Sequence, residues 1–141
     1  MSDFKIVYKD NLSTEMTHLD SGDKIVTDAP KDNQGLGRTF SPTDLIASSL
    51  GSCMITIIAI AARTHNLNIS GMDSNVSKIM STTSPRRIDR VNVIINIKGK
   101  FNQKSKKIIE RSANNCPVHH SLNSKIKINL KINYLSKDNE S

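Results

Sequence analysis

The stretch SPTDLIASSLGSCMITIIAIAARTH, from Ser41 to His65, is the longest apolar run of the chain and decides its fold. Its first residues carry the signals of a helix start. Ser41 is a natural N-cap, Pro42 suits the first helical position, and Asp44 completes an S-x-x-D capping box. The pattern therefore predicts one long helix over 41–65, which spans about 36 Å at the usual helical rise.

The second half of this predicted helix has no polar face. From Cys53 to Ala62 every residue except Thr56 is apolar, so the helix either spans a membrane or is buried on every side. A membrane span needs about 20 predominantly apolar residues, and small or polar residues interrupt this run: Ser48, Ser49, Gly51, Ser52 and Thr56. We therefore expect a core helix with no membrane partner. Because a small domain has difficulty surrounding a helix, we also expect a second subunit, whose helix could approach closely at Ser48, Gly51, Ser52 and Ala59.

Length and composition bound the class of protein. The chain has 141 residues, of which 36% are hydrophobic and 4% aromatic. This predicts one domain over residues 1–141 with a core of aliphatic side chains. The N-terminal sequence MSDFKIV lacks the charged-then-apolar pattern of a signal peptide. The sequence therefore predicts a cytoplasmic protein, in which the two cysteines are redox-active, metal-binding or inert rather than joined in a structural disulfide.

The net charge of +7 raises the question of nucleic-acid binding. The arrangement of the charges argues against it. Lys125, Lys127 and Lys131 alternate with apolar residues, as on the solvent face of a strand, and the arginines within 86–90 mark a hairpin tip. We find no interleaved aromatic residues for base stacking and no nucleic-acid-binding motif. The charges therefore predict a solvated surface and no nucleic-acid partner.

The elements around the long helix predict an α+β fold. Strand patterns occur at 4–8, 12–19, 24–27, 73–83, 88–98 and 125–134. A second helix is expected over 102–115, after which Pro117 opens a short helix with Cys116 at its cap. Strands, long helix, hairpin, helix and strand in that order are typical of an antiparallel sheet rather than of a βαβ repeat.

The two cysteines are the candidates for chemistry. Cys53 lies twelve positions after Ser41, too deep in the helix for the N-terminal dipole alone to acidify it, so its thiolate needs a nearby cation or hydrogen-bond donor. Cys116, at its predicted cap, faces free backbone N–H groups that stabilise a thiolate. Either can instead be an ordinary buried small residue. His119 and His120 could join the cysteines as zinc or iron ligands, or one of them could be a hydrogen-bond partner of a cysteine.

The segment SPTDLIASSLGSC, followed 63 residues after Cys53 by CPVHHSL from Cys116, resembles the OsmC/Ohr superfamily of thiol-dependent hydroperoxide reductases, and most closely its OsmC-like branch. The resemblance covers nearly the whole chain, and the cysteine segments are its most specific part. It implies an α+β fold with an antiparallel sheet and a long buried central helix, assembled as an intertwined homodimer. In such a dimer the two long helices are buried together and each active site lies at the subunit interface.

The resemblance also implies roles for the two cysteines. Cys53 matches the peroxidatic cysteine, which attacks the O–O bond of an organic hydroperoxide and becomes a sulfenic acid. Cys116 matches the resolving cysteine, which condenses with it to a disulfide and releases water. An external thiol then restores the enzyme. The family uses no metal or organic prosthetic group, so the expected partners are a small-molecule hydroperoxide and a thiol reductant.

The residues that would activate Cys53 depart from the pattern of the Ohr branch. That branch pairs an N-terminal arginine with a glutamate directly after the proline that opens the helix. Here Thr43 stands at that position and the acid follows one residue later, at Asp44. Arg38 is the nearest cation in the sequence and our candidate for holding the Cys53 thiolate, while Asp44 either belongs to the site or only caps the helix. The alternative function is a non-catalytic module that binds a small apolar or thiol-reactive ligand at the dimer interface.

Overall fold

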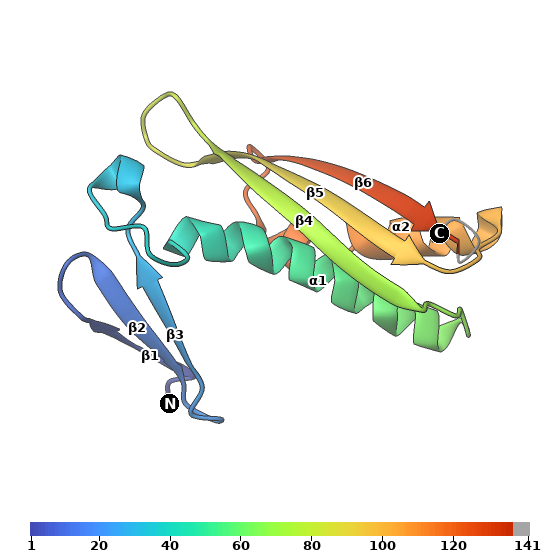
Figure 1. The fold of residues 1–141 in the computed structure, drawn as a ribbon, viewed down its shortest axis with the longest axis horizontal. Helices are drawn as coiled ribbons and strands as arrows, with labels where there is room; N and C mark the ends of the chain where they lie inside the picture. Colours follow the sequence, from blue (N-terminus) through green and yellow to red (C-terminus); the bar gives the residue numbers. More distant parts are fainter. Residues whose placement is uncertain (137–141) are drawn as a thin grey trace. The chain divides into compact units, whose positions relative to one another are not determined.

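The structure is a computed structural model that describes residues 1–136. Within these residues the chain forms two compact units, one from Met1 to Ile46 and one that begins at Ala47. Strands, a long helix, further strands, helices and a last strand follow in the predicted order (Figure 1). The α+β class with a long central helix is confirmed. The prediction of one domain includes 137–141, which lie outside the described residues, and it stays a prediction.

The first unit contains a small antiparallel sheet. Its strands β1 (Phe4–Tyr8), β2 (Ser13–His18) and β3 (Lys24–Asp28) pair in that order. β2 begins one residue later than predicted because Leu12 has a left-handed backbone, with a φ of 60°, and belongs to the turn. The short 3-10 helix η1 (Lys31–Asn33) then lies in the connection to the long helix.

The long helix α1 (Pro42–Thr64) begins as the sequence predicts. The backbone N–H of Ser41 donates to Asp44 Oδ2 at 2.9 Å, and the backbone N–H of Asp44 donates to Ser41 Oγ at 3.1 Å. These reciprocal bonds form the predicted capping box, which satisfies two backbone donors at the helix start. The helix ends one residue before the predicted His65.

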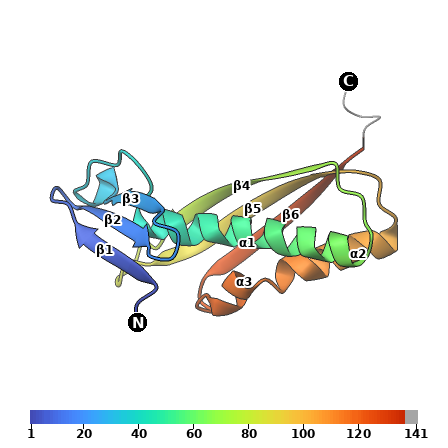
Figure 2. The same cartoon turned by 90° about the horizontal axis from the view of Figure 1, so that it is seen from below.

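The second sheet is mixed rather than wholly antiparallel. β4 (Gly71–Met80) pairs antiparallel with β5 (Ile88–Lys98), and β5 pairs parallel with β6 (Lys127–Leu135). A parallel pair needs a crossover of about a dozen residues or more. Here α2 (Gln103–Asn114) and α3 (Pro117–Ser121) form the crossover (Figure 2). The prediction of a wholly antiparallel sheet is therefore wrong for β6, because residue alternation marks a strand without giving its direction.

One face of the second sheet carries the core of that unit. The inward residues of β5 are at most 1% exposed: Val91, Val93, Ile95 and Ile97. α1 packs on β4, and α2 covers β6 on the same face (Figure 2). At Gly51 a Cβ atom would lie 2.6 Å from Val76 Cγ2 and 3.2 Å from Ser74 Oγ. We expected another helix to approach α1 closely at Gly51. In the structure it is strand β4 that lies close to this glycine.

Within the described chain α1 is buried on one side only. Its buried residues form a single stripe: Ala47, Leu50, Gly51, Met54, Ile58 and Ala62. On the opposite side Ile60 is 56% exposed. By length and composition alone the helix could cross a membrane, since an 18-residue stretch of it has a mean hydropathy of 2.1. Its buried stripe fits a core helix packed on a sheet, and cover of the other side by a second subunit stays a prediction.

Candidate active site

Cys53 lies in the middle of α1. Its side chain is half-buried and packs against the core of the second unit. Ala62 and Leu50 on the buried stripe fix the rotation of the helix, so Cys53 is held at the margin between the core and the open side. A thiol in this position combines a fixed direction with access for a small molecule.

Cys116 lies at the start of α3, as the sequence predicts. It has the extended backbone of an N-cap, Pro117 follows in the first turn, and the backbone N–H of His119 donates to the Cys116 sulfur at 3.3 Å. The residue is 0% exposed and belongs to the core cluster of the second unit. Cys116 is therefore reached only from within the protein.

The structure brings the two cysteines together. The Cys53 side chain is close enough to act on the Cys116 thiol, although 63 positions separate the two residues in the sequence. Burial is the largest influence and raises the pKa of the Cys116 thiol; the N–H of His119 opposes it, and the hydrogen bond and charge of Cys53 raise the pKa further. Cys116 therefore remains a thiol at a pH where an ordinary cysteine begins to ionise.

Arg38 pairs with Asp28, an acid that the sequence analysis did not single out. Nε and Nη2 of Arg38 donate to the Asp28 carboxylate at 2.8 and 3.0 Å, and the backbone N–H of Arg38 donates to it at 2.9 Å. Asp28 is 1% exposed, whereas the Arg38 side chain is 60% exposed. The hydrogen bonds from Arg38 lower the pKa of the Asp28 carboxyl from 3.8 to about 2. A buried acid thus holds one edge of an accessible guanidinium.

No local pattern marks Asp28 in the sequence. It ends β3, and its burial follows from the register that places it opposite Ser13. Arg38 and Asp28 both lie in the first unit, and Cys53 lies in the second. The pairing of Arg38 with the Cys53 thiolate therefore stays a prediction.

Asp44 has a structural task in the capping box of α1. On a regular helix, residues nine apart lie on opposite faces and about 13 Å apart along the axis. Asp44 and Cys53 of one helix are separated in this way, so the carboxylate does not face the sulfur of its own helix. The geometry favours the capping role that the sequence analysis left as one of two possibilities.

His119 and His120 differ in their surroundings. Nε2 of His120 lies 3.3 Å from Asn115 Oδ1 on the exposed side, and the two imidazole rings stack at 6.0 Å. Nδ1 of His119 is buried and has no hydrogen-bond partner among residues 1–136. Within the same residues no three His, Cys, Asp or Glu side chains group as metal ligands. The geometry gives no support to the zinc or iron alternative.

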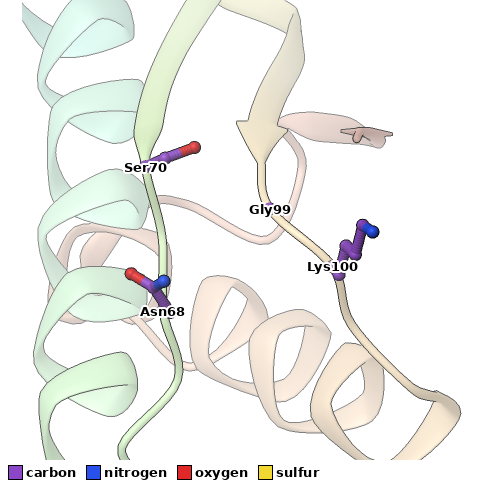
Figure 3. Close-up of a pocket in the computed structure, with 4 residues that line it drawn as sticks. All are labelled: Asn68, Ser70, Gly99 and Lys100. Carbon is purple, nitrogen blue, oxygen red and sulfur yellow. The ribbon is translucent and has the colours of Figure 1, made fainter. Parts of the chain in front are cut away.

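Among the cavities that lie away from the cysteines, two differ in character. The first, of about 220 Å³, is lined by Asn68 and Ser70 before β4 and by Gly99 and Lys100 after β5 (Figure 3). The Ser70 hydroxyl and N–H both donate to the Lys98 carbonyl, at 3.2 and 2.9 Å, which joins the ends of β4 and β5. The second, of about 330 Å³, is apolar and lies on the first sheet, lined by Phe4, Ile6, Met16, Thr17, His18, Asp23 and Ile25. Neither cysteine is among the described lining residues of either cavity.

Comparisons with known proteins connect this geometry to a family. The family model described as OsmC-like protein matches residues 34–131, which include Arg38 and both cysteines. The crystal structure of a candidate osmotic stress induced and detoxification response protein from Psychrobacter arcticus superposes with a TM-score of 0.88. It is 42% identical in sequence, over 94% of this chain and 96% of that one.

More distant structures share the fold. An organic hydroperoxide resistance protein OsmC from Legionella pneumophila has a TM-score of 0.76 at 15% identity, over 92% of this chain and 94% of that one. A candidate organic hydroperoxide resistance protein from Vibrio cholerae, with captopril bound in one of its active sites, has a TM-score of 0.74 at 13% identity, over 94% and 92% of the two chains. No curated protein matches the chain.

Proposed function

Because the chain belongs to the OsmC-like protein family, we propose that it is a thiol-dependent peroxidase that reduces organic hydroperoxides. The observation that carries the proposal is the contact between Cys53 and Cys116, in which a half-buried thiol meets a fully buried one. Two thiols in contact can supply the two electrons that cleavage of one O–O bond requires. The sulfurs alone therefore account for the chemistry of the reduction.

In the first step the Cys53 thiolate attacks one oxygen of the hydroperoxide. An S–O bond forms as the O–O bond breaks, the leaving alkoxide takes up a proton and departs as an alcohol, and Cys53 becomes a sulfenic acid. Cys53 suits this step because it is the more accessible of the two sulfurs.

In the second step Cys116 attacks the sulfur of Cys53. An S–S bond forms, Cys116 gives up its proton, and the sulfenic oxygen leaves as water. Two molecules of an external thiol then reduce the disulfide and regenerate both cysteines. Since the cytoplasm maintains such thiols in reduced form, we place the protein there.

We assign Arg38 to the Cys53 thiolate, with Asp28 rather than Asp44 as its acidic partner. Asp28 binds the Nε and Nη2 groups of Arg38, which orients the guanidinium and leaves its Nη1 group for a second anion. A cation beside a cysteine sulfur favours the thiolate, which is the reactive form. In this assignment Asp44 caps α1.

We also propose that the protein works as a homodimer. Ile6, Met16 and Ile25 lie opposite one another across the first sheet, and Ile6 and Ile25 are 58% and 49% exposed. An apolar sheet face and the open side of α1 are surfaces of the kind that a second copy covers. In the dimer each Cys53 would lie in a pocket shaped by both chains.

Cumene hydroperoxide added to the reduced protein tests the peroxidase. We expect it to consume two thiols per chain and to join Cys53 to Cys116, as seen by peptide mass spectrometry. Cys53→Ser should abolish turnover with a thiol reductant, and Cys116→Ser should stop at a sulfenic acid that dimedone traps. A Cys53→Ser protein that consumes the hydroperoxide as fast as wild type would show that the proposal is wrong.

The apolar cavity on the first sheet supports a second candidate function. A non-catalytic member of the fold would bind a small apolar or thiol-reactive ligand at the dimer interface. It predicts negligible turnover and no disulfide in the presence of peroxide, but a higher melting temperature with ligand. Thermal unfolding with cumyl alcohol, which lacks the O–O bond, separates binding from catalysis.

A further inference from the structure

One group beside Cys116 takes no part in either of the steps proposed for the two cysteines. Nδ1 of His119 is buried and unpaired among residues 1–136. Buried polar atoms in native proteins are nearly always hydrogen-bonded, so an unpaired one calls for an explanation. An imidazole nitrogen is also the protein group best suited to take up a proton near neutral pH.

His119 occupies the position from which a side chain reaches back to Cys116. Cys116 is the N-cap of α3, and the backbone N–H of His119 already donates to its sulfur at 3.3 Å. In a capping box it is the residue at this third helical position whose side chain turns back toward the N-cap. The proton transfer inferred below requires the imidazole to turn Nδ1 toward the Cys116 sulfur.

His120 is the natural comparison within the same short helix. It has the same side chain, one residue further on, but its ring is directed to Asn115 on the exposed side. The two histidines therefore differ in burial and in hydrogen bonding, although they have the same side-chain chemistry and are neighbours in the sequence. Any effect that belongs to His119 alone has to come from its buried location.

Cys116 needs a proton acceptor to act as a nucleophile. The thiolate, not the thiol, attacks a second sulfur, and Cys116 is closed off from solvent. Burial first, and then Cys53, raise the pKa of the Cys116 thiol. Loss of the proton into bulk water is therefore both unfavourable and obstructed.

We propose that His119 accepts the proton of Cys116 as Cys116 attacks the sulfur of Cys53. The inference rests on the proposed pairing of the two cysteines. With the ring proton on Nε2, the lone pair of Nδ1 takes the thiol proton while the S–S bond forms. The imidazolium then returns a proton to the hydroxide that leaves Cys53, which departs as water, so that atoms and charges balance.

Cys53 and His120 are titratable side chains that also lie beside this pair. Cys53 of α1 meets Cys116, but it carries the leaving group and cannot also accept the proton. His120 stacks on His119, yet its Nε2 is directed to Asn115. Of the groups placed here, His119 is the one with a buried ring nitrogen left for the transfer.

A disulfide-exchange assay on the full chain isolates this step without a hydroperoxide. The accessible Cys53 first attacks a disulfide sulfur of dithiobis(nitrobenzoate), which releases one thionitrobenzoate and leaves the other bound to the Cys53 sulfur. Attack by Cys116 then releases the second one and closes the disulfide. The absorbance of thionitrobenzoate thus gives separate rates for Cys53 and for Cys116.

The variants His119→Asn and His119→Gln retain a polar side chain but cannot take up the proton. We expect the second release to slow by about 10²-fold at neutral pH, the lower end of the usual effect of a positioned base. The first release should not change, which also reports that the variants are folded. The deficit should shrink at alkaline pH, where hydroxide deprotonates Cys116 directly. The matched control His120→Asn should release both groups as wild type does.

Two results would overturn the assignment. One is a second release in His119→Asn and His119→Gln at the wild-type rate, and the other is an equal slowing in His120→Asn. Failure of the proposed function looks different. A protein that does not reduce cumene hydroperoxide, yet shows a second release dependent on His119, would refute the peroxidase and leave this inference standing.

Discussion

At the scale of single residues, the Asp28–Arg38 pair makes the stability of the folded chain depend on pH. The pKa of the Asp28 carboxyl falls from 3.8 to about 2 in the folded chain because Arg38 binds the charged form. The unfolded chain therefore holds this proton more tightly than the folded one does. The pair stabilises the fold above about pH 4, and that stabilisation is lost as the pH falls toward about 2.

We expect Asp28→Asn to lower the free energy of unfolding at neutral pH. The variant should also lose less stability than wild type between about pH 4 and about pH 2, because asparagine does not ionise. Urea unfolding followed by circular dichroism at several pH values measures both effects. Asp20→Asn, at an exposed turn, is the matched control. Acid-unfolding curves that coincide for Asp28→Asn and wild type would contradict the role of the pair.

The residues of the site differ in how far the sequence reveals them. A local signal marks the element of each cysteine, so both elements could be predicted. The signal is the helix start at Ser41 for Cys53 and Pro117 for Cys116. The burial of Asp28 comes from pairing with β2, and its partner Arg38 lies ten positions away beyond a 3-10 helix. The unpaired Nδ1 of His119 likewise depends on packing. Contacts between elements are not encoded in the spacing of neighbouring residues.

At the scale of elements, the packing of α1 on β4 depends on the lack of a side chain at Gly51. A Cβ atom at this position would meet the methyl group of Val76 at 2.6 Å. A β-branched side chain in a strand has little freedom to move aside. The helix and the sheet therefore approach each other only with glycine here.

We predict that Gly51→Ala destabilises the protein although alanine favours the helix. The helical preference contributes about 1 kcal/mol in favour of alanine, whereas overpacking costs about 1–3 kcal/mol. Denaturant unfolding should show a net loss, and Gly51→Ala combined with Val76→Ala should show weaker overpacking. Ser52→Ala, on the exposed side of the same helix, is the control without a clash. A Gly51→Ala protein more stable than wild type would refute this account of the packing.

The elements themselves were largely predictable, but their pairing was only partly so. The alternation over β6 marks a strand and its inward face, and that face is the one that α2 covers. The parallel direction of β6 against β5 depends on where α2 and α3 lead the chain. The same limit applies to Gly51, whose small size is visible in the sequence while the surface that approaches it is not.

At the scale of the whole molecule, the exposed apolar residues set the expected assembly. Phe4, Ile6 and Ile25 on the first sheet are 60%, 58% and 49% exposed, and Ile60 on α1 is 56% exposed. Side chains of this size on adjoining strands form a patch that an isolated chain would present to water. A homodimer removes that exposure, and it would explain why the predicted central helix is only half covered within one chain.

We expect sedimentation equilibrium to give a dimer for wild type and a monomer for Ile6→Glu. The new carboxylate would have to be buried without a partner in the dimer, which is costly. Lys5→Glu changes charge on the other face of β1, since alternate residues of a strand point to opposite sides, and should leave the dimer intact. A dimeric Ile6→Glu protein would place the interface elsewhere.

The separation of the two contacting sulfurs along the chain has a consequence for the lifetime of the protein. A bridge between Cys53 and Cys116 would close a loop of 63 residues that contains β4, β5 and α2. In the chain-entropy model such a loop restricts the unfolded chain by an amount worth about 4 kcal/mol. Each oxidation would thus make the chain harder to unfold and to degrade, and each reduction would reverse this. A cell under peroxide stress would then retain more of the protein simply because more of it is crosslinked.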